Sequence, residues 1–118
     1  MDGDDKIRGL GDQDALFGGP GNDFLVGGPN DEEGHYKSND VLWGGPGSDV
    51  LYGGAGADFL YCEEGNDVLY GGDGNDTIVE DDDQRDMLNC GEGWDQYTAD
   101  KIAYVSSSCK KKWNGVVY

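Results

Sequence analysis

A nine-residue spacing of aspartates constrains this chain more than any other feature of its sequence. The aspartates that follow the spacing, with one gap of seventeen residues and one of ten, are Asp5, Asp14, Asp23, Asp40, Asp49, Asp58, Asp67, Asp76, Asp86 and Asp95. Two residues after each of them stands an apolar or aromatic side chain: Ile7, Leu16, Leu25, Leu42, Leu51, Leu60, Leu69, Ile78, Leu88 and Tyr97. Self-similarity at a fixed period predicts a repeat architecture in which each unit stacks on its neighbours.

The composition taken without its order favours a different reading. Hydrophobic residues make up 36% of the 118 residues, 22 residues are glycine, and the formal net charge is −17. Such a chain has too little apolar surface to offset its conformational entropy, which is typical of a disordered linker. The register of the aspartates argues against that reading, at least for a metal-loaded state.

The charge also limits the partners of the chain. Its 25 acidic residues against 8 Lys and Arg would repel the phosphates of nucleic acid, so we expect no nucleic-acid binding. They call instead for a cationic partner, and bare metal ions are the simplest. No stretch approaches the roughly 20 apolar residues of a membrane span.

The repeat units carry a resemblance to a known family. The clearest copies read GGPGNDFLV (18–26), GGPGSDVLY (44–52), GGAGADFLY (53–61) and GGDGNDTIV (71–79), and weaker copies read CEEGNDVLY (62–70) and CGEGWDQYT (90–98). Over about residues 2–98 this pattern resembles the GGxGxDxUx nonapeptide of RTX, or hemolysin-type, calcium-binding proteins. The resemblance implies an all-β, right-handed parallel β-roll of two short-stranded parallel sheets, with two nonapeptides per coil. We expect the roll over 1–98, with an insertion at about 30–38, and a disulfide-linked C-terminal cap over 99–118.

The same residue types suit a calcium site. Glycine tolerates backbone conformations that other residues avoid, so a GGxG run can turn tightly and aim carbonyl oxygens at one point. Calcium takes six to eight oxygen ligands at about 2.3–2.6 Å. The resemblance implies that each ion lies between turns two repeats apart and is bridged by their aspartates.

The predicted ligands therefore fall into two rows. One edge carries Asp14, Asp40, Asp58, Asp76 and Asp95, and the other carries Asp5, Asp23, Asp49, Asp67 and Asp86. Backbone carbonyls would come from Gly18, Gly19, Gly44, Gly45, Gly53, Gly54, Gly71 and Gly72. Each row has room for about four ions if every turn is intact, which gives about eight Ca²⁺ at most.

Electrostatics predicts that metal binding and folding are one event. About eight divalent ions would nearly cancel the net charge of −17. Without them, carboxylates about 4.8 Å apart along each edge would repel one another. Other metals fit less well, because an EF-hand needs a glutamate at loop position twelve, zinc wants Cys and His, and magnesium keeps water ligands.

Two units depart from the repeat, and the pattern ends before the chain does. The unit that begins at Gly27 carries about eight extra residues, Asn30 to Lys37, and the unit from Glu80 (EDDDQRDML) lacks glycines. After Asp95 the pattern fades. We expect incomplete ligand sets at these places. The acidic insertion is read as a solvated loop, or alternatively as a supplementary metal site that includes His35.

The cysteines predict a disulfide between the last repeat and the tail. Cys90 replaces the first glycine of its unit and Cys109 lies in the non-repetitive tail, so a bridge between them would fasten the tail across the end of the roll. Cys62 falls on the opposite edge and is expected to be free. The alternative is three reduced thiols. Three cysteines in a small acidic chain favour an oxidising compartment, and we expect a secreted, extracellular protein.

The N-terminus and the tail each carry an expectation. No signal peptide precedes the repeats, and Met1 lies within the pattern, so the chain is expected to be trimmed from a longer precursor. Lys110, Lys111 and Lys112 in the tail would either lie near the acidic edges as part of the cap or form a docking site for a partner.

The outward strand positions are apolar, which leaves two readings open. They are Phe17, Phe24, Val26, Val41, Trp43, Val50, Tyr52, Phe59, Tyr61, Val68 and Tyr70. Cross-strand ladders of this kind stabilise a sheet by themselves. A regular apolar face also suits a protein-binding surface, including self-association.

The sequence shows no spacing of a base and a nucleophile, so we expect no catalytic residues and no enzyme. The expected function is a secreted calcium-binding repeat module whose folding is driven by Ca²⁺, with a scaffold or binding role. The alternative is an accessory, calcium-triggered folding domain of a larger secreted enzyme or toxin.

Overall fold

Short parallel strands make up the regular structure of the chain. The computed structural model describes residues 3–9, 13–28, 39–80, 85–93, 95–98, 104–106, 108–109 and 111–112. Its strands are β1 (Lys6–Arg8), β2 (Ala15–Phe17), β3 (Phe24–Val26), β4 (Val41–Trp43), β5 (Val50–Tyr52), β6 (Phe59–Tyr61), β7 (Val68–Tyr70), β8 (Thr77–Val79), β9 (Met87–Asn89), β10 (Gln96–Thr98), β11 (Tyr104–Val105) and β12 (Lys111–Lys112). Within these ranges no helix is long and apolar enough to cross a membrane.

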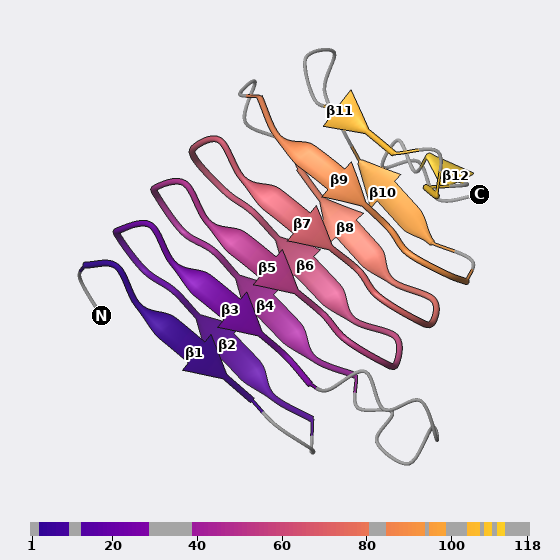
Figure 1. Cartoon of the computed structure of the whole chain (residues 1–118), viewed down its shortest axis with the longest axis horizontal. Helices are drawn as coiled ribbons and strands as arrows, with labels where there is room; N and C mark the ends of the chain where they lie inside the picture. The colour runs from indigo at the N-terminus through magenta and orange to yellow at the C-terminus, as the bar shows by residue number, and fades with distance from the viewer. Residues whose placement is uncertain are drawn as a thin grey trace.

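The strands alternate between two sheets. One sheet has the order β1-β3-β5-β7-β9-β11 and the other has the order β12-β10-β8-β6-β4-β2. Every pair is parallel, and the coils follow one another from the N-terminal end to the C-terminal end (Figure 1). Two nonapeptides therefore make one coil. The predicted all-β fold of two parallel sheets is confirmed.

A single column of aliphatic side chains fills the space between the sheets. In a strand of three residues the middle side chain points to one face and its neighbours to the other. The buried middle side chains are Leu16, Leu25, Leu42, Leu51, Leu60, Leu69, Ile78 and Leu88. Ile7 and Tyr97 are partly buried and pack against this column. The apolar residue two places after each aspartate is thus the core.

The register passes over the insertion without a break. Leu16 of β2 pairs with Leu42 of β4, although these residues are further apart in the chain than Leu42 and Leu60 of β4 and β6. The extra residues therefore leave the ladder intact. The insertion itself, including His35, lies outside the described residues, and so do the side chains of the tail lysines.

The C-terminal segment extends both sheets and is covalently fixed. β11 pairs with β9, and β12 pairs with β10. A Cys90–Cys109 disulfide joins the last coil to the tail, with a Cα–Cα distance of 4.9 Å. This confirms the predicted bridge, and Cys62 is buried and not disulfide-bonded, as expected.

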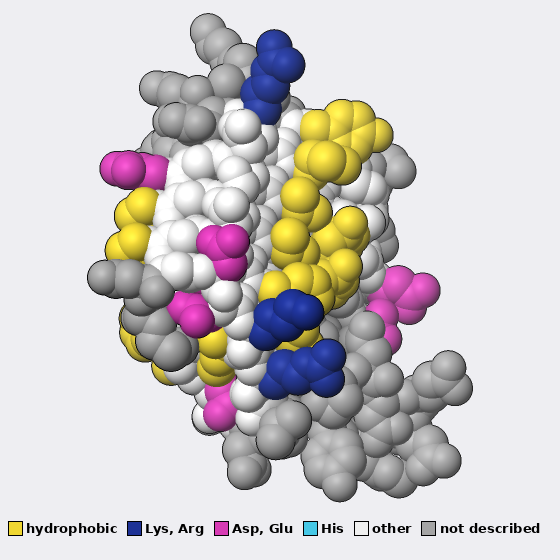
Figure 2. Space-filling view, turned by 60° about the vertical axis from the view of Figure 1, so that its left-hand side comes forward, with side chains coloured by type: hydrophobic (Ala, Val, Ile, Leu, Met, Phe, Trp, Pro, Cys, Tyr) yellow, Lys and Arg dark blue, Asp and Glu magenta, His cyan; other side chains and the backbone are white. Residues whose placement is uncertain are grey.

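Aromatic stacks line the outer faces. On one sheet Phe17 stacks on Trp43 at 4.4 Å between ring centroids, and Trp43 stacks on Tyr61 at 5.8 Å. On the other sheet Tyr52 stacks on Tyr70 at 4.5 Å. Figure 2 shows a band of hydrophobic side chains along one face, with basic side chains at its lower end. Because parallel register places identical strand positions side by side, these stacks repeat along the roll.

Candidate metal-binding site

Each row of aspartates forms a continuous hydrogen-bonded ladder. On one edge the backbone N–H of each aspartate donates to Oδ1 of the next, through Asp5, Asp23, Asp49, Asp67 and Asp86, at 2.6–2.8 Å. On the other edge the same bonds run through Asp14, Asp40, Asp58, Asp76 and Asp95, at 2.8–2.9 Å. The structure thus brings together the two rows of residues that the repeat predicts.

The second carboxylate oxygens of these ladders lack donors. Oδ2 is buried and has no hydrogen-bond partner among the described residues in Asp5, Asp14, Asp23, Asp49, Asp58 and Asp76. A buried, unpaired carboxylate oxygen is costly, since it has lost water without gaining a donor. A row of such oxygens on each edge is the arrangement that a row of cations would satisfy.

Backbone carbonyls face the same oxygens. A β-carbon added at Gly18 would lie 2.5 Å from Oδ2 of Asp23 and 2.5 Å from the carbonyl oxygen of Gly44. The two oxygens therefore lie within about 5 Å of each other, which is the span across a calcium ion with bonds of 2.3–2.6 Å. Only glycine leaves this space open, so the residues present fit a calcium ion.

The space recurs along both edges. At Gly53 the added β-carbon would lie 2.6 Å from Oδ2 of Asp58 and 2.6 Å from the carbonyl oxygen of Gly71. The carbonyl of Gly53 faces the space at Gly27 in the same way. Among the predicted carbonyls, those of Gly44, Gly53 and Gly71 thus face a carboxylate.

The predicted carbonyls of the second glycines lie elsewhere. Those of Gly19, Gly54 and Gly72 lie against the second residue of the following turn, at Gly45, Gly72 and Gly91. Among the described glycines, none has the carbonyl oxygen of Gly18 or Gly45 beside its added β-carbon.

Sequence reasoning missed carbonyls from non-glycine residues. The carbonyl oxygen of Cys62 lies 2.9 Å from a β-carbon added at Gly44, and that of Cys90 lies 2.6 Å from one added at Gly71. Both occupy the first position of their units, as Gly27 does. The position in the repeat is the signal that identifies them, because every residue has a backbone carbonyl whatever its side chain.

A second, outer ladder also escaped the sequence analysis. An asparagine before a ladder aspartate accepts a backbone bond from the equivalent residue of a neighbouring coil: Ser48 N–H donates to Oδ1 of Asn22, and Ala57 N–H to Oδ1 of Asn39. Arg85 N–H donates to Oδ1 of Asn66 in the same way. The recurrent asparagine before the aspartate is the sequence signal for this ladder.

Burial raises the pKa of the stacked carboxyls. The pKa of Asp49 rises to about 6, that of Asp58 to about 7 and that of Asp76 to about 9. Loss of water is the main cause, the backbone N–H donor opposes it, and the neighbouring carboxylates add to it. Without cations, these side chains therefore keep their protons to pH values well above 3.8, the ordinary pKa of an aspartate.

The turn after β8 lacks the glycines of the repeat. Glu80 takes the place of the first glycine and is buried, and its carbonyl oxygen accepts a bond from the Thr98 hydroxyl at 3.1 Å. Residues 81–84 lie outside the described part of the chain. The ladder still passes this turn, because Asp67 N–H donates to Oδ1 of Asp86 at 2.6 Å.

Comparison with known proteins agrees with this geometry. A family model described as the RTX calcium-binding nonapeptide repeat, with four copies, matches residues 1–31, 37–68 and 63–79. These residues form most of the chain and include the turns with the facing carbonyls and carboxylates. No curated protein and no solved structure matches the chain significantly.

Proposed function

Because the chain belongs to the RTX calcium-binding nonapeptide repeat family, and is thus a calcium-binding repeat module, we propose that calcium bound along both edges drives its folding. The observation that carries this proposal is the row of buried, unpartnered Oδ2 atoms, which lie beside a backbone carbonyl of a neighbouring turn at Asp14, Asp23, Asp49, Asp58 and Asp76. The aspartates from Asp5 to Asp95 would supply the carboxylates, and the first residue of each turn would supply a carbonyl.

The two oxygens of each carboxylate have separate tasks in this proposal. Oδ1 accepts the backbone N–H of the neighbouring aspartate and sets the register. Oδ2 would bind the cation. Calcium would supply the positive charge that protons supply in its absence, so the metal-free chain at neutral pH would lose most of its fold.

We further propose a secreted scaffold or binding role and no enzymatic activity. The Cys90–Cys109 disulfide is compatible with an oxidising compartment. Carboxylates that bind calcium would not be available as acid–base pairs, which supports the absence of enzymatic activity. The alternative, an accessory folding domain of a larger secreted enzyme or toxin, would use the same calcium response.

The outer faces support a structural role for their aromatic side chains. The rings of Phe17, Trp43 and Tyr61 stack on one another, so they already contact apolar neighbours within the sheet. We therefore expect a calcium-loaded monomer in sedimentation equilibrium at high concentration. A reversible dimer would instead favour the reading in which these faces bind a second copy.

Calcium titration tests the main proposal. Far-ultraviolet circular dichroism and calorimetry should show a largely unfolded chain at pH 7.5 that gains β signal with calcium at about 10⁻⁴–10⁻³ M, and that binds about eight ions or fewer. Magnesium at equal ionic strength is the control and should produce little β signal. A fully folded spectrum in calcium-stripped buffer at this pH would contradict the proposal.

A further inference from the structure

Cys62 places a thiol where most turns of the roll have open space. It occupies the first position of its unit, which is glycine at Gly18 and Gly44. At those glycines the missing β-carbon would lie 2.5 Å from the buried, unpartnered Oδ2 of Asp23 and Asp49. The side chain of Cys62 therefore points toward the same carboxylate face that the other turns of this edge leave open.

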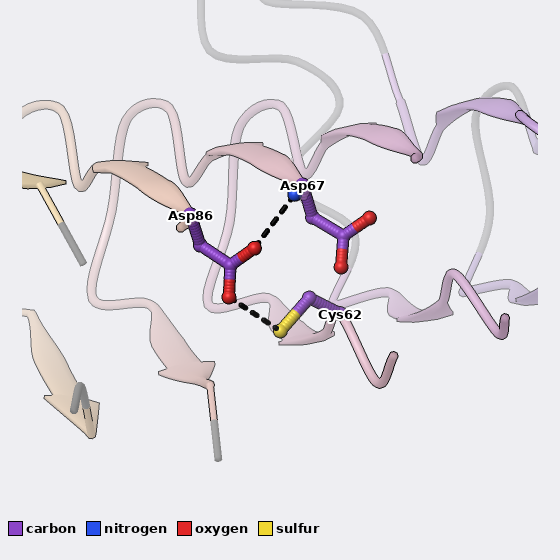
Figure 3. Close-up of side chains that lie close together, drawn as sticks. All are labelled: Cys62, Asp67 and Asp86. Atoms are coloured by element: carbon purple, nitrogen blue, oxygen red, sulfur yellow. Dashed lines mark hydrogen bonds between the residues drawn. The ribbon is translucent and has the colours of Figure 1, made fainter. Parts of the chain in front are cut away.

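The thiol lies with two carboxylates of the aspartate ladder. The ligand atoms of Cys62, Asp67 and Asp86 all lie within 4.8 Å of one another, and all three side chains are buried. The sulfur lies 3.8 Å from Oδ2 of Asp86, whose Oδ1 accepts the backbone N–H of Asp67 (Figure 3). Cys62 follows β6, while Asp67 precedes β7 and Asp86 precedes β9, so adjacent strands of one sheet hold the two carboxylates.

We propose that Cys62, Asp67 and Asp86 form a site for a thiophilic divalent cation of the zinc class, in place of a calcium ion at this position of the edge. Zinc binds cysteine sulfur at about 2.3 Å and carboxylate oxygen at about 2.0–2.2 Å, which puts the donors of a tetrahedral site about 3.5 Å apart. The observed separation of 3.8 Å between sulfur and Asp86 is close to that value. All three ligand atoms lie within 4.8 Å of one another, so side-chain movements of about 1 Å would close the site.

The ligand chemistry separates this position from the rest of the edge. Calcium takes oxygen ligands alone, whereas a thiolate selects softer cations. The next turn also lacks the glycines of the repeat, since Glu80 takes the first place. On binding, the Cys62 S–H bond breaks, the proton goes to solvent, and the sulfur electron pair goes to the cation.

The other cysteines do not compete for the cation. Cys90 has the same position in its own unit, but its sulfur is bonded to that of Cys109. Of the three cysteines of the chain, Cys62 is therefore the one outside the disulfide. In protein kept without reductant, a sulfur–metal signal has a single source.

Cadmium absorption tests the site. The probe is Cd²⁺ added to the calcium-saturated, disulfide-intact chain in oxygen-free buffer. The expected result is a thiolate-to-cadmium charge-transfer band that saturates at one equivalent and is displaced by Zn²⁺ but not by further Ca²⁺. Cys62→Ser should abolish the band, and Asp86→Asn should keep the thiol but weaken Cd²⁺ binding at least tenfold.

Several outcomes would overturn the inference. They are the absence of the band in the native chain, unchanged Cd²⁺ affinity in Asp86→Asn, and displacement of Cd²⁺ by calcium alone. If Cys62→Ser fails to fold with calcium, Cys62→Gly installs the residue of the other turns and should lose the band. A chain that folds with calcium but shows no band refutes this site alone, whereas a band without calcium-induced folding refutes the proposed function alone.

Discussion

The backbone N–H of Asp58 donates a 2.9 Å hydrogen bond to Oδ1 of Asp76, whose Oδ2 is buried without a hydrogen-bond partner among the described residues. One oxygen of the carboxylate thus holds the coil register while the other remains available to a cation. A substitution can therefore remove the negative charge of the side chain and still keep the oxygen that accepts the backbone N–H. This division of tasks also leads us to expect that the metal-free fold depends on protons.

The calcium-free fold should be favoured by acid. The pKa values of Asp49, Asp58 and Asp76 rise from 3.8 to about 6, 7 and 9, so the folded chain binds more protons than the unfolded chain. Stability from these groups is therefore fully present below about pH 4 and is lost as pH rises through these values. In calcium-stripped buffer, circular dichroism should show more β signal at pH 4 than at pH 8. A β signal that grows with pH would contradict this.

The last glycine of a GGxG turn can lie tightly against the neighbouring coil, as Gly47 does. Gly47 has φ +126°, and a β-carbon there would collide with the carbonyl oxygen of Gly21. We expect Gly47→Ala to lower the free energy of unfolding by roughly 3 kcal/mol or more. Gly3→Ala is the matched control, because Gly3 has φ +117° but no atom within 4 Å of the added carbon.

Calcium-dependent thermal denaturation measures both variants. The control should lose about 1–2 kcal/mol, the usual cost of a side chain at positive φ. Equal losses in the two variants would mean that backbone conformation, and not contact between coils, fixes these glycines.

Glu63 occupies a strained position that glycine would relieve. It is the non-glycine residue with positive φ in the described chain, at φ 68°, and it takes the place of the second glycine of its unit. Glu63→Gly should raise the free energy of unfolding by about 1 kcal/mol and therefore raise the midpoint of thermal unfolding. Glu64→Gly, next to it, should lower or leave the midpoint unchanged. Destabilisation by Glu63→Gly would show that the glutamate makes a compensating interaction.

The fold could be predicted from the sequence because two features of the repeat, its aspartates and its apolar residues, both indicate it. The aspartates mark the turns, and the apolar residue two places later marks the inward strand position, as Leu25 and Leu51 show. β11 could not be predicted from the repeat, since Tyr104 and Val105 follow no glycine turn. Its pairing depends on the free edge that β9 offers, which is a property of the assembled sheet.

The two rows of aspartates in the candidate site could be predicted from the sequence, but the task of each carboxylate oxygen could not. Spacing identified the two rows of carboxylates, yet only the parallel register shows that Oδ1 is used by the ladder. The contribution of Cys62 through its backbone carbonyl was hidden, because the side chain breaks the glycine pattern while the carbonyl keeps its place. A sequence motif is defined by side chains, so it identifies a backbone carbonyl only through the position of its residue in the repeat.

The disulfide should contribute measurably to stability. Cys90 and Cys109 are 19 residues apart, and closing a loop of this size stabilises a fold by about 3 kcal/mol. The double variant Cys90→Ser with Cys109→Ser should need more calcium to fold and should unfold at lower denaturant. The reduced native chain is the control and should behave like the variant. An unchanged denaturation midpoint would show that the tail adds nothing to the roll.

Interior and terminal aspartates should differ in the number of ions that they hold. Asp58 accepts the N–H of Asp40 and donates to Asp76, so it has a neighbour on each side, whereas Asp95 follows Asp76 as the last aspartate of the row. If neighbouring carboxylates share an ion, Asp58→Ala should bind two fewer calcium ions and Asp95→Ala one fewer. With calcium tenfold above each dissociation constant, each site stabilises the fold by about 1.4 kcal/mol. The losses should then be roughly 3 and 1.5 kcal/mol.

In the same experiment, Asp58→Asn distinguishes the loss of calcium binding from the loss of the ladder hydrogen bond. Asparagine keeps an oxygen that accepts the N–H of Asp40 but removes the charge, so this variant should lose calcium nearly as Asp58→Ala does while it retains more of the metal-free fold at pH 8. Calorimetric stoichiometry and circular dichroism measure the two effects independently. A diffuse electrostatic attraction would make the loss of bound calcium depend on charge alone. Equal losses in Asp58→Ala and Asp95→Ala would therefore exclude ions shared between neighbouring turns, because only shared ligands give an interior aspartate twice the effect of a terminal one.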